Sequence, residues 1–224
     1  MCVNKREYFC SWSGGKESAL SLYRAQQKGI PIRFLVTMVH PDGKISRSHG
    51  IKSYLLEQQA EAMGIPLVQG RAGWDTYEEE FKKVIQGLRK NNIGGGIFGD
   101  IDIEEHRDWV ERICRDIDMK AILPLWEGKR EELLEEFIQT GFKALVVVTN
   151  SDFLGKEWLG RQINKEFVKE LRRLENIDLC GEKGEYHTFV YDGPVFKRSV
   201  EFSIGEETLR DKHWFLRLKT KEDE

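Results

Sequence analysis

The chain has 224 residues, of which 40% are hydrophobic and 11% aromatic, and this composition excludes a disordered or fibrous protein. Lys and Arg number 35 against 38 Asp and Glu, a net charge of -3, so no overall positive charge attracts nucleic acid. No apolar run reaches the roughly 20 residues that span a bilayer, and the N-terminus lacks a signal-peptide pattern. We therefore expect a cytoplasmic protein with no membrane and no direct nucleic-acid partner.

The first strand and helix are marked by a change of pattern near the N-terminus. An apolar run over 8–12 predicts a strand, and the amphipathic stretch over 17–27 predicts a helix. Gly29 and Pro31 end that helix, because glycine favours a left-handed cap and proline cannot continue a helix. The next run, 32–39, is almost continuously apolar, as expected of a strand buried in a parallel sheet.

The same alternation of strand and helix continues as far as residue 149, which indicates a parallel sheet with helices packed on it. Asp75 stands where a side-chain cap would begin the third helix. The further helices are predicted over 52–63, 75–90, 104–116 and 129–140, and the further strands over 66–69, 95–98, 121–123 and 142–149.

Beyond residue 149 the pattern changes. A helix is predicted over 164–174, and a glycine-rich segment follows at 178–189. The alternating segments 195–204 and 214–218 predict antiparallel strands joined by a polar turn.

The predicted fold class is therefore α/β, with a doubly wound parallel sheet and a smaller C-terminal α+β region. We divide the chain into 1–125 and 126–224, with the boundary between 125 and 150 not sharply marked. The four cysteines form no C-x-x-C pair, which predicts packed, reduced thiols rather than a zinc knuckle or a redox dithiol. They are Cys2, Cys10, Cys114 and Cys180.

The segment SGGKES, residues 13–18, stands between the first strand and the first helix. Its glycines let the backbone approach a ligand, the helix N-terminus attracts an anion, and Lys16 adds a positive charge. A turn that binds nothing would also suit this composition. The segment is not a Walker loop, because Cys10 stands where the first glycine is needed and Glu17 where Ser or Thr should follow the lysine.

This segment resembles the pyrophosphate-binding loop S-G-G-K-D-S of the N-type ATP pyrophosphatases, with Glu17 in place of Asp. Those enzymes share an adenine-nucleotide α-hydrolase-like fold. The segments GDI at 99–101, HRDWVE at 106–111 and PLW at 124–126 resemble landmarks of the diphthine–ammonia ligase family among them.

The glycine-rich segment GEKGEYHTF, residues 181–189, resembles a second signature of that family, G-E-G-G-E-[FY]-E-[TS]. Lys183 replaces a glycine and His187 replaces a glutamate of the signature. Together these segments extend the resemblance over about residues 8–196.

The resemblance implies an ATP-dependent amide ligase, which adenylates a carboxylate with release of pyrophosphate and then transfers ammonia with release of AMP. It implies ATP and Mg²⁺ as cofactors, ammonia as a substrate, and diphthine on elongation factor 2 as the acceptor. It also implies that residues 1–125 bind the nucleotide and that 126–224 bind the acceptor. A homodimer is left open.

Three alternatives stay open at this point. Relatives with a histidine at the position of His187 point to a related ATP-dependent amidation in cobalamin salvage. A non-catalytic ATP-binding module could also carry the loop. A tRNA-thiolating pyrophosphatase is disfavoured. Such enzymes commonly use a cysteine pair or a metal site and an RNA-recognition domain, and the sequence shows neither.

The resemblance, with the rule that ligands bind at the carboxyl ends of parallel strands, selects the candidate site residues. The catalytic candidates are Lys16, Asp100 and Glu185; the nucleotide-binding candidates are Ser11, Ser13, Gly14, Gly15, Lys16, Ser18, Met38 and His49; the substrate-binding candidates are Gly99, Asp100, Glu182, Glu185, His187 and Thr188. No residue is assigned to a metal.

Several of these residues have an equally simple structural role. Asp100 could cap the following helix, His49 could be structural, and the Met38 side chain is expected to pack in the core while its backbone contacts adenine. Asp102 belongs to an acidic cluster that is expected to face solvent at a helix start.

Overall fold

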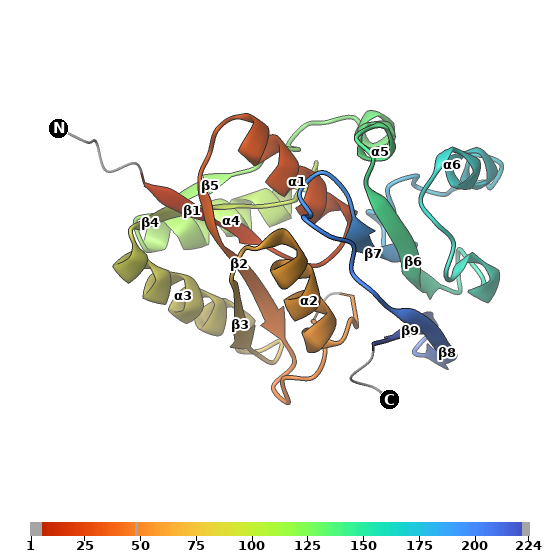
Figure 1. Cartoon of the computed structure of the whole chain (residues 1–224), viewed down its shortest axis with the longest axis horizontal. Helices are drawn as coiled ribbons and strands as arrows, with labels where there is room; N and C mark the ends of the chain where they lie inside the picture. The colour runs from red at the N-terminus through yellow and green to blue at the C-terminus, as the bar shows by residue number, and fades with distance from the viewer. Residues whose placement is uncertain (1–5, 48, 221–224) are drawn as a thin grey trace.

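The computed structural model describes residues 6–47 and 49–220, and Cys2 lies outside them. Its larger sheet is wholly parallel, with the strand order β3-β2-β1-β4-β5 (Figure 1). The chain leaves β1 in one direction along the sheet and returns to its other side at β4, so the switch point lies between these two strands. The strands are β1 (Glu7–Ser11), β2 (Ile32–Val39), β3 (Leu67–Arg71), β4 (Ile93–Ile97) and β5 (Lys120–Ile122).

Helices cover both faces of this sheet, as the doubly wound fold requires. Cys10 and Leu35 face one side with α1 and α2, whereas Phe9 and Val36 face the other side with α3 and α4. This alternation follows from the period of two in a strand. The helices are α1 (Lys16–Gln27), α2 (Ser53–Met63), α3 (Tyr77–Leu88) and α4 (Glu104–Asp116).

The second sheet is antiparallel, with the order β7-β6-β9-β8. The β8–β9 hairpin turns at Asp211 and Lys212, which both have positive φ (46° and 64°), as a tight two-residue turn requires. The elements of this region are α5 (Arg130–Gln139), β6 (Lys143–Asn150), the 3₁₀ turn η2 (Lys156–Trp158), α6 (Lys165–Leu171), β7 (Tyr186–Asp192), β8 (Ser203–Arg210) and β9 (His213–Lys219).

The predicted α/β fold is confirmed, and three local predictions are wrong. The strand predicted over 142–149 does not join the parallel sheet, because β6 pairs antiparallel with β7 and β9. Asp75 does not cap α3: Thr76 is the N-cap residue, its hydroxyl accepts the Gly73 amide, and α3 ends in the 3₁₀ turn η1 (Arg89–Asn91). The strand predicted over 195–204 is largely irregular, and β8 begins only at Ser203.

The two regions share one hydrophobic core. Leu22 of α1, Phe137 of α5 and Phe189 of β7 belong to a single buried cluster. Cys10, Cys114 and Cys180 are free and buried, as predicted. Within residues 6–47 and 49–220, no helix combines the length and the apolar character needed to cross a membrane.

A buried glutamine joins the two regions beside the SGGKES segment. Gln59 of α2 is 0% exposed. Its Oε1 accepts the Trp12 indole N–H (2.8 Å), and its Nε2 donates to the carbonyls of Gly14 (3.0 Å) and Val190 (2.6 Å). Both polar atoms of the Gln59 side chain therefore have hydrogen-bond partners, in the loop that follows β1 and in β7.

Replacing Gln59 by Leu is expected to lower the free energy of unfolding by about 3 kcal/mol, because the buried Trp12 indole N–H loses its acceptor and the carbonyls of Gly14 and Val190 each lose a donor. Urea denaturation measures this loss as a lower midpoint. The half-buried neighbour Gln58, changed to Leu, is the control and should unfold close to the wild-type midpoint. Equal midpoints for the two variants would contradict the role given to Gln59.

Candidate active site

The loop after β1 is held in a tight turn that only glycine allows at one position. Gly14 has φ +83°, and a Cβ on it would lie 2.7 Å from Leu56 Cδ2. The turn is stabilised from within, since Ser18 Oγ donates to the Gly15 carbonyl (2.9 Å) and the Gly15 amide donates to Ser13 Oγ (3.3 Å). The loop thus presents the N-terminus of α1 at the carboxyl end of the parallel sheet.

A pocket of about 340 Å³ opens at this point and gathers most of the predicted site. It is lined from both regions of the chain, which brings the SGGKES segment against the GEKGEYHTF segment. The predicted residues that line it are Ser11, Ser13, Lys16, Ser18, His49, Gly99, Asp100, Glu182 and His187; Glu17, His106, Cys180, Gly181, Gly184 and Tyr186 line it as well.

Four other predicted residues do not line this pocket. Gly14 and Gly15 form the turn, and a Cβ on Gly15 would lie 3.1 Å from His49 Nε2. Thr188 is buried, and its hydroxyl accepts the Lys16 amide (3.1 Å). Met38 is 5% exposed with its side chain in the core, as expected, and its carbonyl accepts the Arg47 amide (3.1 Å).

Glu185 is placed differently from its predicted contact with substrate. It is 0% exposed and does not line the pocket. Its two carboxylate oxygens accept the backbone amides of Asp178 and Lys183, each at 3.0 Å. These contacts fit a residue that shapes the 178–184 loop rather than one that contacts substrate directly.

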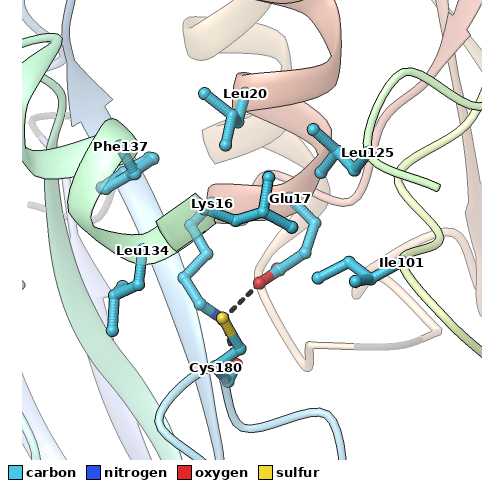
Figure 2. A pocket seen from close by; sticks show the side chains of 9 residues that line it. Lys16, Glu17, Leu20, Ile101, Leu125, Leu134, Phe137 and Cys180 are labelled. Carbon is cyan, nitrogen blue, oxygen red and sulfur yellow. Dashed lines mark hydrogen bonds and ion pairs between the residues drawn. The ribbon is translucent and has the colours of Figure 1, made fainter. Parts of the chain in front are cut away.

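Lys16 is the most constrained charge of the site. Its Nζ donates to the Cys180 carbonyl (2.5 Å), pairs with Glu17 and lies 4.8 Å from the centre of the Tyr186 ring. Figure 2 shows the side chains of Lys16 and Glu17 converging toward Cys180 beneath an apolar wall. Burial is the largest single effect and opposes the charge, but Glu17 and the weaker contributions of Tyr186, Cys180 and Glu182 together outweigh it, and the pKa of Lys16 is raised.

Shifted pKa values are also found for Glu182, His187 and His49 in this pocket. Burial, and then the charge of Glu17, raise the pKa of Glu182 to about 7. Burial, and then Lys16, lower the pKa of His187 to about 4, and burial lowers the pKa of His49 as well. The two imidazoles meet edge to face at 4.6 Å between ring centres, so a neutral pair stands where the family signature has a carboxylate.

An ion-pair network that the sequence did not reveal holds the loop over the pocket. Arg130 pairs with Asp102 through both Nε and Nη2 (2.7 Å each) and also contacts Asp178. Asp178 in turn accepts the amides of Cys180 (3.0 Å) and Glu182 (3.1 Å). Asp102 is exposed, as predicted, and also belongs to this network. Its partners are too far away in the sequence to be recognised by spacing.

Asp100 does not cap the next helix, since the N-cap residue of α4 is Ile103. Its carboxylate lies in the pocket, 3.4 Å from His106 Nδ1, and this contact raises the pKa of His106. The described residues contain no group of three or more His, Cys, Asp or Glu side chains placed to hold a metal. Single carboxylates of the pocket such as those of Glu17 and Asp100 fit Mg²⁺, which is commonly held by one or two carboxylates together with substrate phosphates.

Two family models match the chain. The N-terminal domain of diphthamide synthase matches residues 8–121, and the C-terminal domain of diphthamide synthase matches residues 129–222. The chain belongs to the diphthamide synthase family. The resemblance drawn from SGGKES and GEKGEYHTF is thereby confirmed.

Relatives of known assignment agree with this membership. A protein of Rattus norvegicus is 26% identical over 228 residues, covering 91% of this chain and 85% of the relative. A protein of Homo sapiens is 25% identical over the same length, with the same coverage of both chains. Each of these relatives of the diphthamide synthase family is named diphthine–ammonia ligase.

Changing Glu182 to Gln is expected to raise the melting temperature at pH 8 by roughly 2–4 °C, which corresponds to a gain of about 1 kcal/mol in the free energy of unfolding. A carboxyl whose folded pKa of about 7 exceeds its unfolded value of 4.5 favours folding less as pH rises through that window. At pH 4 the carboxyl is mostly protonated in both the folded and the unfolded state, so the variant and the wild type should have similar melting temperatures.

The exposed Glu166, changed to Gln, is the control and should show no such dependence on pH. A Glu182→Gln variant that is destabilised at pH 8 would show that the ionised carboxylate is stabilising, against the burial and the charge of Glu17.

Proposed function

We propose that this protein is an ATP-dependent amide ligase that converts diphthine on elongation factor 2 to diphthamide in the cytoplasm. The observation that carries the proposal is the meeting of the two signature segments in one pocket, where the Lys16 amide donates to Thr188 and Lys16 Nζ donates to the Cys180 carbonyl. The relatives named diphthine–ammonia ligase support the assignment. Residues 1–125 would bind the nucleotide and 126–224 would contribute the acceptor side.

The loop at Gly14 is assigned to the β and γ phosphates of ATP. The N-terminus of α1 offers amides and a partial positive charge, and Lys16 and the hydroxyls of Ser13 and Ser18 supply further donors. In this assignment the phosphates replace Glu17 as the partner of Lys16. Mg²⁺, held by the nearby carboxylates and the phosphates, would neutralise charge on the leaving pyrophosphate.

The chemistry has two steps. A carboxylate oxygen of the acceptor attacks the α phosphorus, and pyrophosphate leaves. Ammonia then attacks the acyl carbon, AMP leaves with the carboxylate oxygen, and the ammonia nitrogen loses a proton. Glu182 is assigned as the group that takes this proton, because its pKa lies near 7 and it faces the pocket.

A second acceptor is favoured by one observation. His187 replaces the signature carboxylate, and with His49 it forms a neutral pair at the pocket wall. A carboxylate at this position would attract a cationic acceptor, whereas a neutral imidazole does not. The same adenylation and amidation would then act on a carboxylate of the kind met in cobalamin salvage.

Changing Lys16 to Met should lower the rate of AMP and pyrophosphate release by about 100-fold, because a preorganised cation next to the leaving group is lost. Ion-exchange chromatography of the nucleotide products, with ATP, ammonia and diphthine-bearing elongation factor 2 present, measures this rate. Lys28→Ala, at the exposed end of the same helix, should release AMP at the wild-type rate. If the wild type released only ADP and orthophosphate, the assignment would be wrong.

Changing His187 to Glu should raise the rate with diphthine relative to a cobyric-acid-type carboxylate by about tenfold, the effect of 1.4 kcal/mol of charge attraction. Parallel amidation assays with the two acceptors give the ratio. Gln27→Glu, which adds a carboxylate at the exposed end of α1, is the control. An unchanged ratio of the two rates would show that residue 187 does not determine which acceptor is used.

A further inference from the structure

Unsatisfied polar atoms concentrate in the loop that follows β2. Four buried side-chain nitrogens have no hydrogen-bond partner among the residues that the structure describes. Three of them belong to this loop: Nε and Nη2 of Arg47 and Nδ1 of His49. Buried donors normally have partners, and a charged one without a partner is costly, so this concentration indicates a missing ligand.

The free nitrogens of Arg47 form one edge of its guanidinium. The other terminal nitrogen, Nη1, lies 3.4 Å from the ring of His40, and the guanidinium stacks over the ring of Trp74 with its Cζ 4.0 Å from the ring centre. Stacking and the bond from the Arg47 amide to the Met38 carbonyl fix where the guanidinium lies. The Nε–Nη2 edge is the one that binds a carboxylate with two parallel hydrogen bonds.

The loop that carries this edge reaches the active-site pocket. His49, two residues further on, lines that pocket. Tyr77 lies within electrostatic reach of both Arg47 and Asp100, and Asp100 also lines the pocket. Trp74 is 73% exposed, which leaves a flat apolar surface next to the guanidinium for the body of a larger molecule.

We propose that the Nε–Nη2 edge of Arg47, held against Trp74, binds the carboxylate of the acceptor and presents it to the nucleotide. This inference rests on the proposed function and names the group of the chain that selects a carboxylate substrate. The phosphates of the nucleotide are the other oxyanions that would fit the Nε–Nη2 edge of Arg47. The acceptor is favoured because the loop at Gly14 and Lys16 already supplies donors for phosphate, and because a planar carboxylate matches the planar edge.

The test compares binding of two peptides to the full-length protein, one carrying diphthine and the other carrying diphthamide, in which a carboxamide replaces the carboxylate. Calorimetry should show tighter binding of the diphthine peptide by the wild type. Arg47→Gln should weaken that binding by about tenfold and leave the diphthamide peptide unaffected, since two charge-assisted hydrogen bonds are lost. Arg47→Lys keeps the charge but cannot form two parallel hydrogen bonds, so its affinity for the diphthine peptide should lie between those of the wild type and Arg47→Gln.

The control is Arg161→Gln, because Arg161 also stacks on a tryptophan (Cζ 4.3 Å from the Trp158 ring centre) but pairs with Glu170. It should bind both peptides as the wild type does. Trp74→Ala changes an exposed side chain and should weaken binding of the diphthine peptide by about threefold. This variant provides a second test of the proposal if Arg47→Gln folds poorly.

Affinity for ATP, measured on the same variants, separates the two sources of oxyanion. It should stay within about twofold of the wild type. Weaker ATP binding with unchanged peptide binding would assign the edge to the nucleotide and overturn the proposal, as would unchanged binding of both ligands. The peptide measurement needs no turnover, whereas AMP formation by the wild type tests the proposed function alone, so the two can fail separately.

Discussion

The N-terminus of α1 is tied to the GEKGEYHTF segment by hydrogen bonds that close very long loops of sequence. The Lys16 amide donates to Thr188, 172 residues away, and Lys16 Nζ donates to the Cys180 carbonyl, 164 residues away. Gln59 adds a third connection, from Gly14 to Val190. The SGGKES loop and the GEKGEYHTF segment are therefore one rigid unit, and neither segment has its observed geometry without the other.

This constraint explains the electrostatics of the pocket. Closing the 178–184 loop over the helix N-terminus buries Lys16, Glu17 and Glu182 together, so the lysine stays charged while Glu182 is pushed toward neutrality. Arg130, paired with Asp102 and Asp178, holds the loop in place from outside. A polyanion that enters the pocket meets a preorganised cation, and little charge has to be reorganised when pyrophosphate leaves.

The local patterns of the sequence predicted most of the fold. The strand over 32–39 and the helix over 104–116 coincide with β2 and α4, because a continuous apolar run and a strong helical period are both local signals. The prediction for 195–204 was wrong, since alternating residues there do not pair in a sheet. The roles of Glu185 and Arg130 could not be predicted, because each is set by partners brought near only in the folded chain.

The proposed reaction requires that this site join a carboxylate to AMP before ammonia attacks. The most direct measurement uses an acceptor labelled with ¹⁸O in its carboxylate, followed by mass spectrometry of the nucleotide products. Adenylation transfers one labelled oxygen to AMP for each amide formed, with unlabelled pyrophosphate. Label in orthophosphate accompanied by ADP, or amide formation with unlabelled AMP, would contradict the account.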